Sequence, residues 1–198
     1  MTNNDSPRNR LARPSDPRAV KSRQALRDAL LDLLDARDFD AITIKDITSA
    51  AGLSYPVFFR QFASKEDLLG DLAAKEVQEL LALGQPADDG QPLRGGLMDM
   101  CLHVERRRSL WKTLLTAGAA SEMRTEFARI SAEIGNAGPR ANPWLPVELA
   151  SAFVAAGIFE ILAWWLAQPE DYPIRNVVKI LYALVGRPLA EPQNVQLD

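Results

Sequence analysis

Apolar residues recur at intervals of three and four positions along most of the chain, and no segment keeps the strict alternation expected of a β-strand. One clear case is the stretch that follows Ser64, where the apolar residues lie on one side of a helix. They are Leu68, Leu69, Leu72, Val77, Leu80 and Leu81. The pattern predicts an all-α fold of about nine helices, with no strand and no internal repeat.

Capping residues and breaks place the ends of these helices. Thr43 with Asp46, and Ser64 with Asp67, have the spacing of capping boxes, and Gly52 is suited to the left-handed position that follows a helix. The expected helices span residues 17–37, 43–51, 54–62, 64 to the break at 84–92, 93–107, 109–117, 121–136, 146–167 and 173–185.

The stretch "ITIKDITSAAGLSYPVFFRQF" predicts two short helices joined by a tight turn at Gly52–Leu53, which is the form of a helix-turn-helix. At about 100° per residue, Phe58 and Phe62 fall on the inward side of the second helix. Its length matches the width of a B-DNA major groove. A small helical hairpin within an all-α core remains the alternative. The residues expected to contact DNA are Thr43, Ser54, Tyr55, Pro56, Val57, Phe59, Arg60 and Lys65.

Charge is distributed unevenly along the chain. Residues 1–65 contain 11 Lys and Arg against 8 Asp and Glu, a balance of +3, whereas residues 66–198 contain 12 against 18, a balance of −6. A basic front on an acidic body indicates that the front meets a polyanion, although a solvated tail would explain the first residues equally well.

The stretch "ITIKDITSAAGLSYPVFFRQFASKEDLL" resembles the DNA-binding signature of the tetracycline-repressor (TetR/AcrR) family of bacterial regulators. The resemblance covers residues 23–72 and implies a dimer that binds a pseudo-palindromic operator in double-stranded DNA and is released by a small-molecule inducer. Four positions depart from the family's pattern. Asp38 stands where glycine is common, and Val57 stands where threonine or serine is frequent. Phe59 stands where a tyrosine hydroxyl usually holds a phosphate, and Gln61 stands where histidine is frequent.

The segment "LASAFVAAGIFEILAWWLA" (149–167) resembles the family's eighth helix, which forms the dimer interface with the ninth. It is long enough to span a membrane, but Glu160 near its centre argues against that, so we expect a core and interface helix and no membrane partner. Glu160 is expected either to reach solvent or to be a buried acceptor.

The expected interface residues are Ala152, Ala156, Phe159, Trp164, Val177 and Leu181. The resemblance also implies an inducer pocket, for which the candidates are Met98, Cys101, Trp111, Phe127 and Phe153; each would serve as plain core equally well.

The remaining chemistry is sparse. The single cysteine is typical of a reducing compartment and predicts a cytoplasmic protein, and the single histidine, His103, has no metal-ligand or catalytic pattern around it. We therefore expect no enzyme activity, no cofactor and no metal.

The expected organisation is a flexible basic arm (1–16), a helix-turn-helix DNA-binding domain (17–64), a ligand-binding and dimerisation domain (65–186) and a tail (187–198). The sequence favours a regulator, most simply a repressor. The alternative is an all-α ligand-binding or scaffold protein whose DNA-reading helix is degenerate.

Overall fold

The computed structural model describes residues 17–84, 92–116, 119–137, 141–192 and 195. The chain divides between Leu69 and Gly70 into two compact units. We call the N-terminal unit the head and the C-terminal unit the body. The described residues are helical and contain no strand, which confirms the all-α prediction.

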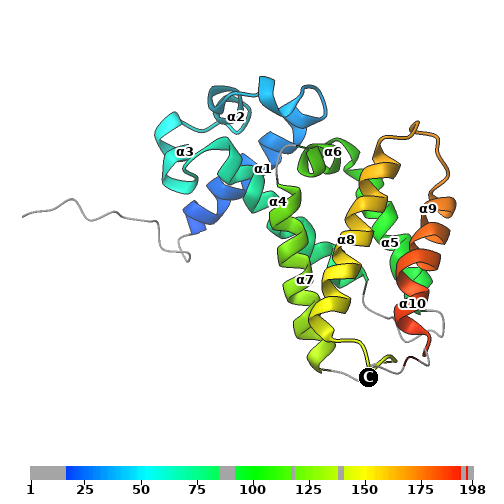
Figure 1. Cartoon of the computed structure of the whole chain (residues 1–198). Helices are drawn as coiled ribbons and strands as arrows, with labels where there is room; N and C mark the ends of the chain where they lie inside the picture. Colours follow the sequence, from blue (N-terminus) through cyan, green and yellow to red (C-terminus); the bar gives the residue numbers. More distant parts are fainter. Residues whose placement is uncertain (1–16, 85–91, 117–118, 138–140, 193–194, 196–198) are drawn as a thin grey trace, which may run out of the picture. The chain divides into compact units, whose positions relative to one another are not determined.

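The head is a small bundle of helices (Figure 1). Its elements are α1 (Pro17–Leu34), the 3-10 turn η1 (Phe39–Ala41), α2 (Ile44–Ala50), α3 (Tyr55–Gln61) and the first residues of α4 (Lys65–Leu83). Leu26 and Leu30 of α1, Ile47 of α2 and Phe58 of α3 are all fully buried, so one apolar core holds the three helices together. The inward positions of Phe58 and Phe62 are thereby confirmed.

Local signals in the sequence determine the helix ends of the head. The Thr43 hydroxyl accepts a hydrogen bond from the Asp46 amide, and the Asp46 carboxylate accepts one from the Thr43 amide, so the predicted capping box is present. Gly52 has φ 63°, the left-handed conformation that the turn between α2 and α3 requires. Both predictions are confirmed.

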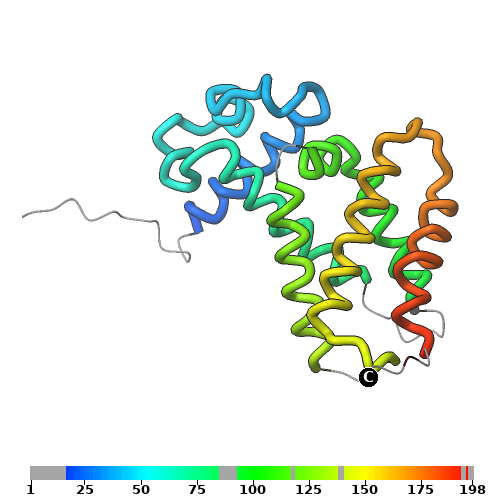
Figure 2. Tube along the Cα trace, viewed as in Figure 1, coloured from blue at the N-terminus to red at the C-terminus, as the bar shows by residue number. Residues whose placement is uncertain are grey.

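The body contains the rest of α4 and the helices α5 (Pro92–Arg106), α6 (Arg108–Thr116), α7 (Ala120–Ala137), α8 (Val147–Leu166) and α9 (Ile174–Leu181). In Figure 2, α8 and α9 run side by side in opposite directions, and α7 lies along the other side of α8. Small residues allow the close approach between α8 and the C-terminal elements. A Cβ on Gly157 would lie 2.8 Å from a methyl group of Val185.

The helix that starts at Ile174 continues beyond its predicted end. A π-helical turn η2 (Tyr182–Gly186) leads directly into α10 (Arg187–Ala190), so the expectation of a loose tail from Arg187 is wrong for these residues. Asn142 explains the difference, because its Nδ2 lies 3.3, 3.1 and 3.1 Å from the carbonyl oxygens of Pro188, Leu189 and Glu191. If Ile174–Ala190 is counted as one helix, the described residues form the nine helices predicted.

Helix α8 is apolar on all sides but is not buried on all sides. By length and composition it could cross a membrane, and 39% of its most apolar window is buried in the protein. Phe159, Leu162 and Trp165 are fully buried, whereas Leu149 and Phe153 on the opposite side are more than half exposed. The side chain of Glu160 reaches solvent and pairs with Arg124 at 3.6 Å, which resolves the two alternatives for this residue.

Candidate functional site

The outward surface of α3 carries aromatic side chains that the fold leaves uncovered. Tyr55 is 53% exposed and Phe59 is 47% exposed, whereas Phe58 between them is buried. The rings of Tyr55 and Phe59 meet edge to face with centroids 5.0 Å apart, so each limits the orientations open to the other. Ser54, Pro56 and Arg60 are exposed and Val57 is partly exposed, which places these predicted residues on one accessible helix surface.

Two of the residues predicted to bind DNA are already used within the head. The Nζ of Lys65 lies 2.9 and 3.0 Å from the carbonyl oxygens of Phe39 and Ile42 and sits 4.5 Å from the centre of the Phe39 ring. The Thr43 hydroxyl donates to the Asp46 carboxylate at 2.6 Å. Since their hydrogen-bond donors are occupied, we exclude Lys65 and Thr43 from the candidate DNA contacts.

A shallow depression lies beside α3. One residue that lines it, Lys45, is a cation that the sequence-based prediction did not include. Tyr55, Thr43, Lys45 and Ser64 line it, and Lys45 is exposed on the first turn of α2. A basic residue one turn into the first helix of a predicted helix-turn-helix is the signal that could have identified it. We therefore call Lys45, Ser54, Tyr55, Pro56, Val57, Phe59 and Arg60 the α3 surface.

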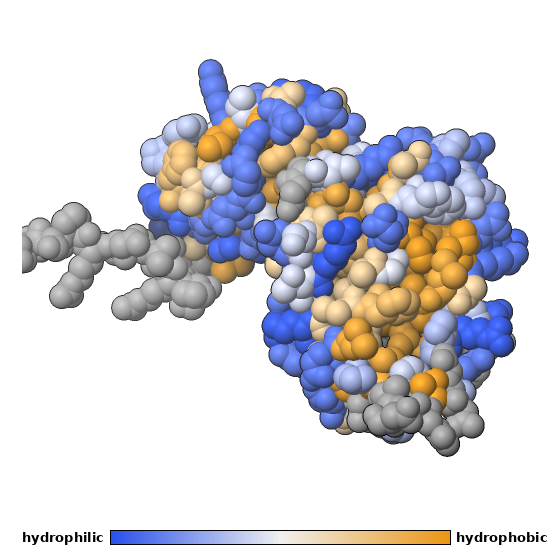
Figure 3. All heavy atoms as spheres, viewed as in Figure 1, coloured by the Kyte–Doolittle hydropathy of each residue, from blue (hydrophilic) through white to orange (hydrophobic). Residues whose placement is uncertain are grey.

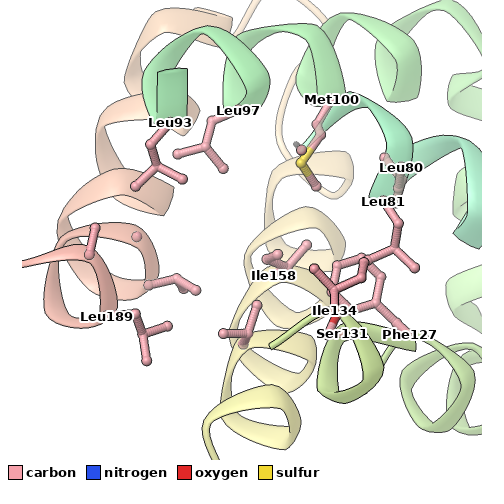
Figure 4. Close-up of a pocket in the computed structure, with 15 residues that line it drawn as sticks. Leu80, Leu81, Leu93, Leu97, Met100, Phe127, Ser131, Ile134, Ile158 and Leu189 are labelled. Carbon is pink, nitrogen blue, oxygen red and sulfur yellow. The ribbon is translucent and has the colours of Figure 1, made fainter. Parts of the chain in front are cut away.

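The body contains an apolar cavity of about 480 Å³. Figure 4 shows leucines of α4 and α5, Phe127, Ser131 and Ile134 of α7, and Ile158 of α8 arranged around it. Its remaining wall comes from Val185 and Gly186 of η2 and from Leu189 and Ala190 of α10. The volume is within the usual range for small-molecule sites.

The predicted pocket residues are scattered, and Phe127 is the one that lines this cavity. Cys101 and Trp111 are completely buried outside its walls, and Met98 is partly buried. Phe153 is 54% exposed and also outside the walls, so its assignment to the pocket is wrong. These predictions rested on residue type, which cannot distinguish a core position from a cavity wall. Burial raises the pKa of the Cys101 thiol to about 12, so the thiol stays protonated at neutral pH.

A buried cluster of polar side chains joins three helices of the body. The fully buried carboxylate of Glu76 on α4 contacts the Arg107 guanidinium, the His103 Nε2 at 2.6 Å and the Trp111 Nε1 at 3.2 Å. Glu79 lies 3.6 Å from His103 and 3.5 Å from Arg107. We call these five residues the Glu76 cluster.

The charges around Glu76 control its ionisation. Burial by itself would raise the pKa of its carboxyl, but the His103 hydrogen bond and the Arg107 charge outweigh burial and lower it below the usual 4.5. Glu76, Glu79 and His103 place three potential metal ligands within 4.8 Å of one another. Arg107 already contacts the carboxylates of Glu76 and Glu79, so its guanidinium supplies the positive charge that a metal ion would otherwise provide.

The apolar exposed face of α8 is the third candidate surface. In Figure 3, apolar residues gather on the body where α8 and α9 lie. Of the predicted interface residues, Ala152, Ala156 and Trp164 are exposed there. Phe159, Val177 and Leu181 are fully buried within the chain, so their assignment to an interface is wrong. Other exposed apolar side chains are Leu149 and Phe153 of α8 and Leu184 of η2. Together with Ala152, Ala156 and Trp164 we call them the α8 face.

Comparison with known proteins supports the interpretation of the head. Residues 26–72 match the family described as bacterial regulatory proteins, tetR family. The chain is 36% identical over 67 residues to the uncharacterized HTH-type transcriptional regulator YxbF of Bacillus subtilis and 38% identical over 69 residues to the HTH-type transcriptional regulator AlkX of Mycobacterium tuberculosis. Each match covers 33% of this chain, but the matches span only 18% and 33% of the two relatives.

The fold agreement extends over the body. The fatty acid degradation regulator FadR of Bacillus halodurans superposes with a TM-score of 0.61 at 17% identity, covering 87% of this chain and 97% of that protein. At that identity the agreement concerns the fold alone. The capped helix-turn-helix and the exposed α3 surface lie within residues 26–72, the part of the chain that matches the tetR family of bacterial regulatory proteins.

Proposed function

We propose that this protein is a cytoplasmic transcriptional repressor that binds a pseudo-palindromic DNA operator as a homodimer and is released by a small molecule. The observation that carries the proposal is the α3 surface, where Tyr55 and Phe59 are exposed next to the buried Phe58. In an ordinary core helix these aromatic rings would be buried, because their burial stabilises the fold. Two exposed aromatic rings on the first two turns of α3 therefore indicate a surface that binds a partner.

The residues around the aromatics make DNA the fitting partner. Tyr55 and Ser54 offer hydroxyl groups, Val57 can contact a thymine methyl group, and Lys45 and Arg60 supply cations for phosphates. The side chain of Phe59 cannot hydrogen-bond a phosphate. It instead holds the Tyr55 ring, and we assign it that positioning role.

The α8 face supports the homodimer. Its alanines allow close approach of a second helix, and its Leu149, Phe153 and Trp164 provide apolar area that a two-fold mate can bury. Trp164 meets Tyr172 edge to face with centroids 5.4 Å apart, and this contact limits the orientations of its exposed ring. A two-fold pair places two α3 surfaces on half-sites a whole number of DNA turns apart.

Fluorescence anisotropy with DNA from immediately upstream of the protein's own gene tests the proposal. We expect salt-weakened binding by two chains per site and at least about a tenfold loss in Tyr55→Ala. Lys45→Ala should lower the slope of log affinity against log salt by about one, because one phosphate contact is lost. Gln78→Ala, at an exposed position of the body, is the matched control.

Two results would contradict the proposal. The first is a genome-wide fragment selection in which the wild-type protein binds no fragment more tightly than random DNA. This result would favour the ligand-binding or scaffold protein with a degenerate DNA-reading helix. A protein that stays monomeric in sedimentation, with Ala156→Arg changing nothing, would remove the dimer. Ala156→Arg should dissociate it, because two unpaired cations would be buried at its centre.

A further inference from the structure

The apolar cavity of the body is larger than a packed core normally leaves open. This space of about 480 Å³ is partly open to solvent, and its apolar walls lack packing partners on one side and hold water poorly. Its walls come from α4, α5, α7, α8, η2 and α10, so the helices of the body hold it open together. Such a space is most simply explained as a site whose occupant completes the packing.

The chemistry of the walls determines the kind of occupant. Among the residues that the structure describes around the cavity, none is charged, and Ser131 is the one polar side chain. The nearby arginines have other partners: Arg94 stacks 4.2 Å above the Tyr182 ring, and Arg187 pairs with Glu191 at 2.9 Å. A charged group inside the cavity would have no counter-ion, and burying it would be costly.

A second, more polar cavity adjoins the first. It measures about 390 Å³ and shares Ser131, Val154, Leu189 and Ala190 with the apolar one, while Asn142 and Ser151 add polar groups on its far side. The two spaces therefore form an apolar chamber and a polar chamber that meet at Ser131. A molecule with a hydrocarbon body and an uncharged hydrogen-bonding end matches both.

We propose that the body binds an uncharged, hydrocarbon-rich amphiphile, such as a medium-chain alcohol, with its chain in the apolar cavity and its polar end at Ser131. The inference deepens the proposed function and rests on it for the regulatory consequence. Binding itself requires neither DNA nor a particular operator.

Calorimetric titration of the full-length protein, without DNA, compares decanol below its solubility limit with decanoate and decylammonium below their micelle concentrations. We expect decanol to bind at least about tenfold more tightly than either ion, because neither charge finds a partner in the walls. Equal binding of decanoate or decylammonium would overturn the uncharged class. Failure of all three to bind would overturn the site.

Variants locate the ligand within the two chambers. Val154→Phe, which fills the shared wall, should abolish decanol binding. Ser131→Ala should weaken decanol several-fold and leave decane unaffected, because decane makes no hydrogen bond. Leu102→Ala, exposed on α5, is the control, and circular dichroism checks that each variant is folded. Decanol binding that survives both cavity variants would contradict the placement.

A parallel anisotropy measurement separates this inference from the proposed function. Decanol that binds in calorimetry but leaves operator binding unchanged supports the site and contradicts its role as the inducer site. Operator binding that is intact in a protein with no affinity for any of the three compounds contradicts the site and leaves the regulator intact.

Discussion

The head and the body are both helical, but different kinds of interaction hold their helices in place. In the head, the helix starts are set by polar side chains that act on residues three or four positions away, as Thr43 does with Asp46 and Ser64 with Asp67. In the body, the buried Glu76 cluster joins polar side chains that are tens of residues apart. The capping residues of the head can be recognised in a short stretch of sequence. The contacts of the Glu76 cluster depend on which helices pack against one another, which a short stretch does not show.

The largest expected effect on stability is in the body, at a contact between residues far apart in the sequence. Glu76→Gln keeps the shape of the side chain, but its amide nitrogen would face a donor of His103, Arg107 or Trp111 in a fully buried site. We expect the free energy of unfolding to fall by about 3–5 kcal/mol, measured by urea denaturation. Glu79→Gln, a partly exposed neighbour in the same cluster, is the control and should cost less than about 1 kcal/mol. Equal losses in the two variants would show that burial of Glu76 does not matter.

Acid should weaken the body through the same residue. The pKa of Glu76 is lower in the folded protein than its usual 4.5, so its contribution to stability is complete above pH 4.5 and is lost as the pH falls through the folded pKa. The urea midpoint of the wild-type protein should therefore drop on the acid side of pH 4.5. In Glu76→Gln the drop should be smaller, and identical pH profiles would contradict the assignment.

An intermediate effect is expected at the C-terminal end of the body. Asn142→Ala removes the amide that binds the carbonyl oxygens of Pro188, Leu189 and Glu191. We expect a loss of about 1–3 kcal/mol and faster hydrogen exchange in α10, measured by mass spectrometry. Asn136→Ala, at an exposed position of α7, is the control. Unchanged hydrogen exchange in α10 would mean that packing keeps this helix folded without the Asn142 hydrogen bonds.

The smallest effect is expected for a local device of the head. Thr43→Ala removes the side-chain cap of α2 and should cost about 1 kcal/mol of stability. Because the Thr43 hydroxyl already donates to Asp46, the affinity for operator DNA should stay at the wild-type value. Ser49→Ala, exposed on the same helix, provides the comparison. A several-fold loss of operator affinity in Thr43→Ala alone would return Thr43 to the DNA contacts.

The sequence could predict the candidate surfaces to different degrees. On α3, the helical period correctly separated the buried Phe58 from the exposed Tyr55, because one short helix lies against one core. On α8 the period could not distinguish the core side from the outer side, since both are apolar, and Phe159 was assigned to the wrong one. Arg107 and Arg108 are adjacent in the sequence but have different partners. Arg108 lies within hydrogen-bond distance of the Trp165 and Leu166 carbonyl oxygens at the end of α8, whereas Arg107 joins the Glu76 cluster.

By itself the sequence determined the helices, their caps, the turn at Gly52 and the family of the head, because these depend on residues within one or two helical turns of each other. The tertiary structure alone decided which cations remain available to DNA, which side of α8 stays exposed and which residues surround the cavity. Lys65 is the clearest instance. Its position at the start of α4 was readable from the sequence, but its hydrogen bonds to Phe39 and Ile42 join residues more than twenty positions apart. Contacts at that separation form only when the chain folds.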